Sequence, residues 1–274
     1  MAKHLGGRQR VRTRVALQVV IFVIACLSLG APVLHEAVAQ SGAAPAGSGL
    51  GSRHWGTRRV PFVLSMGDNV DGSWKQYVRR AISQWSEADE VDMVLVDGGT
   101  TGRTCRPTNG RVEVCNADYG DTGWLGLTRL YYDGDHFTKV TVQFNDYYFN
   151  QSGGQYNTRK ARVHTACHEL GHSLGLPHPP NSSGSCVNDS LDLLEETLTP
   201  VRANFEDIAD LYDHRDRQQT VNRSRGASAA DTSFFAPETL AGTQADGDVQ
   251  HGVIDTPAGD GSGVLSYVTW VNQP

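Results

Sequence analysis

One stretch constrains this chain more than any other: residues 168–178, with the sequence HELGHSLGLPH. On a helix, residues i and i+4 lie on one face, so His168 and His172 are predicted to direct two imidazoles at one metal ion. Glu169 follows the first ligand by one residue, which places its carboxylate beside the ion rather than on it. There it could take a proton from a zinc-bound water. The stretch therefore predicts a zinc site with an adjacent base.

The second half of this stretch predicts a third ligand. Gly175 can end the helix in a left-handed conformation that a Cβ atom disfavours, and Pro177 prevents the helix from resuming. The chain then turns back, and His178 can reach the same ion. Three protein nitrogens leave the fourth tetrahedral position open for water, which is the arrangement of a catalytic zinc rather than a structural one.

The pattern H-E-x-x-H-x-x-G-x-x-H resembles that of the metzincin metalloproteases, and within them the matrixins and snapalysins. Snapalysins usually carry Asp as the third ligand, whereas this chain has His178. The resemblance implies a zinc endopeptidase with Glu169 as the catalytic base. It also implies an α/β, zincin-like fold, with a twisted mixed five-stranded sheet, an active-site helix and a small C-terminal helical subdomain. A core helix with surface histidines is the plainer alternative.

The order of the predicted elements agrees with this resemblance over residues 55–178. Apolar and alternating runs predict strands at 60–64, 91–96, 111–115, 123–132 and 139–145. Apolar residues at helical spacing predict a helix over 73–85, and the zinc helix is expected over 158–174. By itself, this periodicity supports only a mixed α/β domain. A further helix after Pro200 is expected to end near His214, whose ring would interact with the helix dipole.

The resemblance also implies a binding strand for the substrate. In the metzincins, the fourth strand is the sheet edge above the active site, and an extended substrate pairs with it by main-chain hydrogen bonds. That role falls on the first residues of the fourth predicted strand: Gly123, Trp124, Leu125, Gly126 and Leu127. An ordinary internal strand is the alternative interpretation.

The chain departs from the family beneath the zinc. Metzincins usually place a methionine in a tight turn there, but no methionine follows the zinc stretch in this sequence. Val187 is the candidate substitute, with a shorter and stiffer side chain than methionine. No tyrosine lies beside Val187, so the tyrosine ligand of astacin-type enzymes has no match here.

Two further groups of residues could be taken for ligands. His164 lies one helical turn before His168 and is interpreted as a buried neighbour of the site. Asp133, Asp135 and His136 weakly resemble the calcium and structural-zinc loops of matrixins, so Ca²⁺ is a second candidate ion. An ordinary hairpin turn is the alternative at that position.

The cysteines favour an oxidising compartment. Cys26 lies in the N-terminal apolar segment, and the other four allow three disulfide pairings: Cys105, Cys115, Cys167 and Cys186. The pairing of Cys105 with Cys115 is favoured because it would close a short hairpin. It leaves Cys167 with Cys186, which would tie the zinc helix to the segment after the third ligand. A thiol ligand to the metal is the alternative.

The N-terminus has the features of an export signal. A basic segment at 8–14 precedes an apolar run at 15–34, and residues 37–39 (AVA) suit a signal peptidase. We therefore expect a signal peptide at 1–39 and a secreted, extracellular protein without stable membrane association after cleavage. An uncleaved membrane anchor is the alternative. The remaining chain divides into a flexible lead-in or short propeptide (40–54), the catalytic domain (55–216) and a low-complexity tail (217–274) with one strand near 264–271.

The charge limits the partners. The net charge is −6, and it becomes −10 without the five basic residues and one acidic residue of positions 1–39. Such an acidic chain is not expected to bind nucleic acid. We expect a monomer that acts on polypeptide substrates. The alternatives are a catalytically inactive zinc-binding protein, secreted or membrane-anchored, and a zinc hydrolase that acts on other carbonyl compounds.

Overall fold

The computed structural model describes residues 52–178, 184–188, 198–222 and 251–271. All of them belong to a unit of the chain that spans Ala44–Pro274. The predicted signal peptide and nearly all of the predicted lead-in lie outside the described residues, as does most of the segment that follows Asn222.

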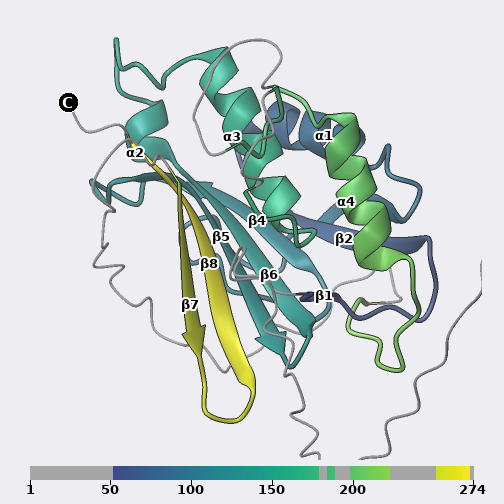
Figure 1. Ribbon diagram of the computed structural model, residues 1–274. Coiled ribbons are helices and arrows are strands. Elements are labelled where there is room, and N and C mark those ends of the chain that lie inside the picture. The colour runs from purple at the N-terminus through teal and green to yellow at the C-terminus, as the bar shows by residue number, and fades with distance from the viewer. Residues whose placement is uncertain (1–51, 179–183, 189–197, 223–250, 272–274) are drawn as a thin grey trace, which may run out of the picture. The chain divides into compact units, whose positions relative to one another are not determined.

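A mixed eight-stranded sheet forms the centre of this unit (Figure 1). The strands follow the order β3-β2-β4-β6-β5-β8-β7, and β1 pairs with β6. Their bounds are β1 His54–Trp55, β2 Phe62–Asn69, β3 Val91–Asp97, β4 Val112–Ala117, β5 Trp124–Asp133, β6 His136–Asn145, β7 His251–Pro257 and β8 Ser262–Trp270. The predicted mixed α/β class is confirmed, but the sheet has more strands than the five expected.

The additional strands come mainly from the C-terminal segment. β7 and β8 pair with each other, and β8 pairs antiparallel with β5 from Trp124 to Asp133. We call this pair the C-terminal hairpin. The expectation that β5 forms the sheet edge is therefore wrong, because the chain's own β8 makes the main-chain hydrogen bonds there. The predicted strand near 264–271 exists, but as one arm of a hairpin that belongs to the sheet.

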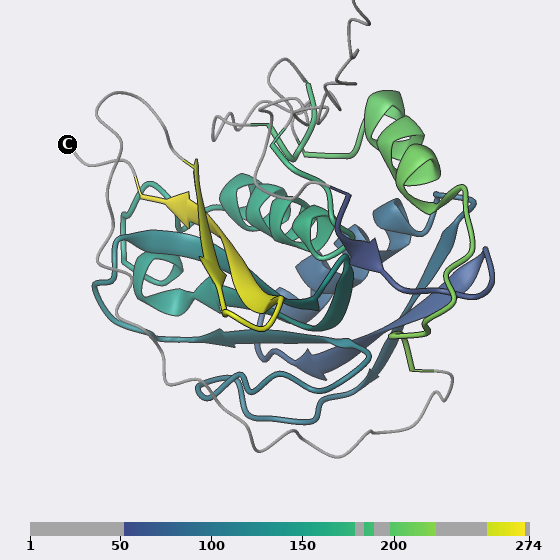
Figure 2. The same ribbon diagram turned by 60° about the horizontal axis from the view of Figure 1, so that its bottom comes forward.

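Helices α1 (Trp74–Trp85) and α3 (Arg159–His172) pack together and against the sheet (Figures 1 and 2). The buried face of α1 consists of the apolar residues at helical spacing: Trp74, Tyr77, Val78, Ala81, Ile82 and Trp85. The indole N–H of Trp85 donates to the carbonyl oxygen of Cys167 at 2.9 Å, which fixes α3 against α1. Two more helices are α2 (Asp146–Phe149) and α4 (Arg202–Tyr212).

The helix that was predicted to supply the first two metal ligands, α3, forms close to where the sequence predicts it. The Thr158 side chain caps α3 by accepting a hydrogen bond from the Ala161 amide. Every residue of α3 from 161 to 172 is buried, so this helix lies within the core rather than on the surface. The alternative of a core helix with surface histidines is thereby contradicted.

Two disulfides link the described residues: Cys105–Cys115 and Cys167–Cys186. This is the pairing that the sequence favours, and such bonds persist in oxidising compartments. No helix within the described residues has the length and apolar character needed to cross a membrane.

Candidate metal centre

The structure brings the three predicted ligands together. The Nε2 atom of His168 lies 2.9 Å from that of His172 and 3.1 Å from that of His178. We call these residues the histidine triad. Gly175 makes the turn that returns His178: its φ is +98°, and an added Cβ atom would lie 3.0 Å from Leu211. Both the backbone conformation and the space therefore require glycine.

The triad is prepared to bind a metal ion. The Nδ1 atoms of His168 and His172 each lie 2.8 Å from a carbonyl oxygen, of Cys186 and Leu176 respectively. A carbonyl only accepts, so each Nδ1 carries the hydrogen and each Nε2 keeps its lone pair. Burial, with the neighbouring histidine rings, holds the pKa of all three imidazoles well below its usual value. Neutral imidazoles with converging lone pairs suit a metal such as zinc.

Glu169 lies beside the triad and is fully buried. Its carboxylate accepts one hydrogen bond from the Thr128 hydroxyl and one from the Thr269 hydroxyl, both at 2.6 Å. Burial raises the pKa of Glu169 to about 8, although both hydroxyls act to lower it. Sequence reasoning missed both threonines, because nothing local links β5 or β8 to α3.

Gly126 makes room for that carboxylate. A Cβ atom at position 126 would lie 2.3 Å from Oε1 of Glu169, closer than real atoms approach. The sequence assigned Gly126 to substrate binding, whereas in this structure its backbone lies against the candidate base. The close approach explains why a strand in the middle of the sheet contains a glycine here.

The other residues of the predicted substrate strand are largely buried. Trp124, Leu125 and Leu127 are at most 6% exposed, and Trp124 and Leu127 pack with Val268 of β8. The amide of Gly123 donates to the Tyr148 hydroxyl at 2.6 Å. Their role in binding substrate stays a prediction, because β8 covers this strand in the structure.

β8 also covers the triad itself. The ring of Tyr267 stacks on His172 with centroids 4.0 Å apart and planes at 13°, and it meets His178 edge-on at 5.3 Å. His168, Glu169 and His172 have no exposed surface. No sequence signal identified Tyr267, because it is distant in sequence and belongs to a segment interpreted as a tail.

Val187 packs against α3, while its role as the substitute for the methionine stays a prediction. Its side chain is fully buried, and a Cβ atom at Gly171 would lie 2.6 Å from its Cγ1. Val187 thus packs against the turn of α3 that separates His168 from His172. His164 is also buried, with its ring 5.7 Å from that of His168, which agrees with its interpretation as a neighbour of the site.

Calcium at Asp133 and Asp135 stays a prediction. Both aspartates are exposed: Asp133 ends β5, and Asp135 lies in the turn between β5 and β6. Within the described residues, two groups of three or more side chains could hold a metal ion, and neither includes Asp133 or Asp135. One group is the triad, and the other contains His54, His214 and Asp216.

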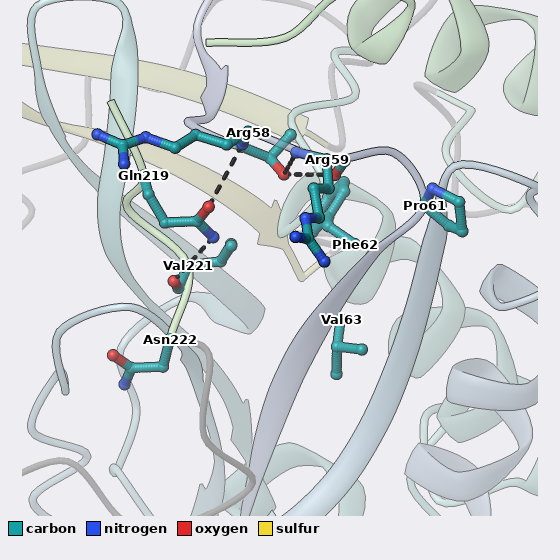
Figure 3. Close-up of a pocket in the computed structure, with 9 residues that line it drawn as sticks. Arg58, Arg59, Pro61, Phe62, Val63, Gln219, Val221 and Asn222 are labelled. Carbon is teal, nitrogen blue, oxygen red and sulfur yellow. Dashed lines mark hydrogen bonds between the residues drawn. The ribbon is translucent and has the colours of Figure 1, made fainter. Parts of the chain in front are cut away.

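A pocket of about 400 Å³ lies outside the triad (Figure 3). Its lining offers no histidine, cysteine or carboxylate: Thr57, Arg58, Arg59, Pro61, Phe62, Val63, Gln219, Val221 and Asn222. The backbone amide of Arg58 donates to the Gln219 side chain across it at 3.3 Å. This pocket lacks the groups that hydrolysis would need, so the triad is the candidate centre.

Comparison with known proteins places this site in no family. No family model matches the chain, and no curated protein matches it. Among solved structures, that of myroilysin is similar with a TM-score of 0.37 and 13% sequence identity, over 63% of this chain and 87% of that one. So slight a likeness supports no assignment. What the described residues establish is a buried triad of neutral histidines that could bind a metal ion, with a carboxylate beside it.

Proposed function

We propose that this chain is a secreted, zinc-dependent endopeptidase of the metzincin type. One observation carries the proposal: the Nε2 atoms of His172 and His178 lie within 3.1 Å of the Nε2 atom of His168, and the buried Glu169 follows His168 on the same helix. The two disulfides support secretion, since such bonds are rare in reducing compartments.

The chain's own residues divide the work of hydrolysis. His168, His172 and His178 would hold zinc, which when bound supplies Lewis acidity to a carbonyl oxygen and to water. Glu169 in its ionised form, which the positive charge of bound zinc would favour, takes the proton of the attacking water and then delivers it to the nitrogen of the departing amine. The Thr128 hydroxyl of β5 holds one carboxylate oxygen in place for this exchange, whereas Thr269 of β8 holds the other in the described arrangement.

The position of β8 bears on how substrate enters. β8 makes with β5 the main-chain hydrogen bonds that an extended peptide would make, and its Thr269 and Tyr267 contact Glu169 and His172. We infer that polypeptide substrates pair with β5 where β8 lies. The described arrangement is then a closed form, and the C-terminal hairpin must move or be cleaved before substrate binds.

The main test is the substitution Glu169→Gln in the full chain. The matched control is Glu206→Gln, at an exposed glutamate of α4. Glu169→Gln should keep the zinc content of the parent, because position 169 is not a ligand. Casein hydrolysis should fall about 10³-fold, the usual contribution of a general base. A Glu169→Gln protein that binds zinc and cleaves casein as fast as the parent would sink the proposal.

A second test concerns the closed form. Asp255 of β7 anchors the hairpin by accepting from the Tyr132 hydroxyl at 2.8 Å and from Arg53 at 3.3 Å. Asp255→Ala should raise casein hydrolysis about tenfold, because losing these anchors favours the open form by roughly 1–2 kcal/mol. Asp92→Ala, an exposed acid on the opposite edge strand β3, is the control. Unchanged hydrolysis with faster amide exchange in β8 would show that hairpin opening does not limit access.

The burial of His168, Glu169 and His172, with only His178 of the triad partly exposed, favours one other candidate, a metal-binding protein without turnover. It predicts zinc in the parent and no casein hydrolysis by the parent, by Asp255→Ala, or after proteolytic removal of the hairpin. Hydrolysis by any of these three proteins would reject it.

A further inference from the structure

A second group of ligand-type side chains gathers away from the triad. It consists of His54 in β1, His136 at the start of β6, and His214 and Asp216 after α4. The Nε2 atoms of the three histidines lie 3.3, 3.1 and 3.2 Å from Oδ1 of Asp216, in that order. We call these residues the histidine–aspartate cluster. Three imidazoles around one carboxylate oxygen form a donor set that zinc accepts.

The spacing of these atoms suits tetrahedral coordination. Zinc lies 2.0–2.1 Å from its nitrogen ligands, so two ligand atoms of a tetrahedral site are about 3.3 Å apart. In the cluster, the Nε2 atoms of His54 and His214 are separated by 3.0 Å. The triad shows separations of 2.9 and 3.1 Å between the same type of atoms. In both groups, three ligand atoms lie within 4.8 Å of one another: those of the triad, and those of His54, His214 and Asp216.

The orientation of His54 also points to a cation. Its Nδ1 lies 2.6 Å from the Ser52 carbonyl oxygen and therefore carries the ring hydrogen. Its Nε2 faces Oδ1 of Asp216 at 3.3 Å and Nε2 of His214 at 3.0 Å. A cation bound there would accept both the imidazole lone pair and the carboxylate charge.

The surroundings hold the cluster in place. Oδ2 of Asp216 accepts the Thr57 amide at 2.7 Å, which leaves Oδ1 for the histidines. The segment after α4 runs beside β1, with main-chain bonds of 2.8 Å from Asp216 to Thr57 and from Thr220 to Gly56 (Figure 1). The side chains of His54 and Asp216 are only 6% and 8% exposed, while that of His214 is 44% exposed. An ion could therefore enter from the side of His214.

We propose that His54, His214 and Asp216 bind a second zinc ion with a structural role, and that His136, whose Nε2 lies 3.1 Å from Oδ1 of Asp216, supplies the fourth ligand. Four protein ligands would then complete the coordination shell, as in a structural zinc site. The ion would join three segments that are far apart in sequence: β1, the start of β6, and the chain after α4. Its binding energy would add to the stability of the folded state.

The first test counts zinc in the purified full chain after removal of loosely bound metal. The parent should contain two zinc ions per chain, His214→Gln one, His172→Gln one, and the double variant none. Asp213→Asn is the matched control, since this neighbouring acid is exposed and its oxygen lies 3.6 Å from His214 Nδ1. It should retain two zinc ions.

Each result decides between the alternatives. One zinc in the parent and none in His172→Gln would overturn the second site while leaving the triad intact. Two zinc ions in His214→Gln would also overturn it. Conversely, one zinc that is lost in His214→Gln and kept in His172→Gln would support the cluster and reject the triad, so the two proposals fail separately.

A second measurement covers the case in which a variant folds poorly. His172→Gln, freed of metal, should bind one equivalent of Co²⁺ with the visible absorption of tetrahedral cobalt. Its melting temperature should rise by about 5 °C on adding zinc, as expected for one additional stabilising site. Absence of both the cobalt spectrum and the zinc-dependent rise would show that the cluster is only a hydrogen-bonded network.

Discussion

The histidine triad and the histidine–aspartate cluster have similar spacing and different surroundings. Their Nε2 atoms lie 2.9–3.1 Å apart in the triad, and those of His54 and His214 lie 3.0 Å apart in the cluster. The triad comes from one helix and the turn that follows it, whereas the cluster joins three distant segments. Within the described residues, only the triad has a buried carboxylate, that of Glu169, beside its metal-binding atoms.

This comparison separates what binds a metal from what makes a metal site reactive. Both groups offer converging imidazoles to a metal ion. The triad would supply three ligands with a candidate base next to them, so water and a carbonyl group could share the ion. In the cluster, Asp216 faces the histidines directly and would itself be a ligand. On the two proposals made above, the location of one carboxylate, beside the ligands or among them, would distinguish hydrolysis from structural support.

The largest expected effect on casein hydrolysis comes from Gly126→Ala, which tests whether the position of the Glu169 carboxylate matters. The new Cβ atom would meet Oε1 of Glu169 at 2.3 Å and displace the carboxylate without touching a ligand. Casein hydrolysis should fall about 10³-fold, as for loss of the base itself, while the zinc content stays that of the parent. Gly259→Ala is the control, because a Cβ atom there meets nothing within 4 Å. Near-normal hydrolysis by Gly126→Ala would mean that the position of Glu169 does not matter.

The next effect is a difference between Glu169 and Asp216 in how their contributions to folding stability depend on pH. Burial raises the pKa of Glu169 to about 8, so its contribution to stability is complete below pH 4.5 and is lost as the pH rises through about 8. For Asp216, burial acts to raise the pKa, but hydrogen bonds from the Thr57 amide and from His136 and His54 outweigh it and lower the pKa. Its contribution is therefore present above pH 3.8 and lost as the pH falls further.

Denaturant unfolding of the metal-free protein checks this difference. Between pH 6 and pH 8 the parent should lose about 2 kcal/mol of stability through Glu169, at about 1.4 kcal/mol per pH unit. Glu169→Gln should lack this loss. Parallel curves for the two proteins would show that Glu169 titrates normally in the folded state.

The smallest effect distinguishes the two disulfides. Cys186 provides both a bridge to α3 and the carbonyl oxygen that accepts from His168 Nδ1. The double variant Cys167→Ser, Cys186→Ser should bind zinc at the triad about tenfold more weakly, because that oxygen orients the ligand. Cys105→Ser with Cys115→Ser, which removes the bridge that lies away from the triad, should leave this affinity unchanged. Competition with a chelator measures the zinc affinity of each double variant. Equal zinc affinities of the two variants would show that the Cys167–Cys186 bridge does not orient His168.

The sequence predicted the triad because its geometry is local. Helical spacing aligns His168 with His172, and Gly175 permits the turn to His178, so a short stretch contains all the necessary information. The apolar face of α1, the extent of α3 and most strands followed from periodicity in the same way. Val187 was identified from its place after the triad, and it is buried against Gly171.

The sequence did not reveal what covers the triad or what forms the second cluster. Residues 251–270 were interpreted as part of a low-complexity tail, yet β8 joins β5 and presents Thr269 to Glu169. His214 was interpreted as a partner of the helix dipole, whereas its ring lies 3.0 Å from His54. In both cases the contact joins residues more than 90 positions apart, which no local spacing can indicate.

By itself, then, the sequence determined a candidate metal centre and the base beside it, because one turn of helix fixes the distances between their side chains. The tertiary structure decided that β5 lies inside the sheet, that the centre is closed by the C-terminal hairpin, and that His54, His136, His214 and Asp216 meet. Strand pairing and the meeting of distant side chains depend on which surfaces the whole chain buries together, so they arise only when the complete core has formed.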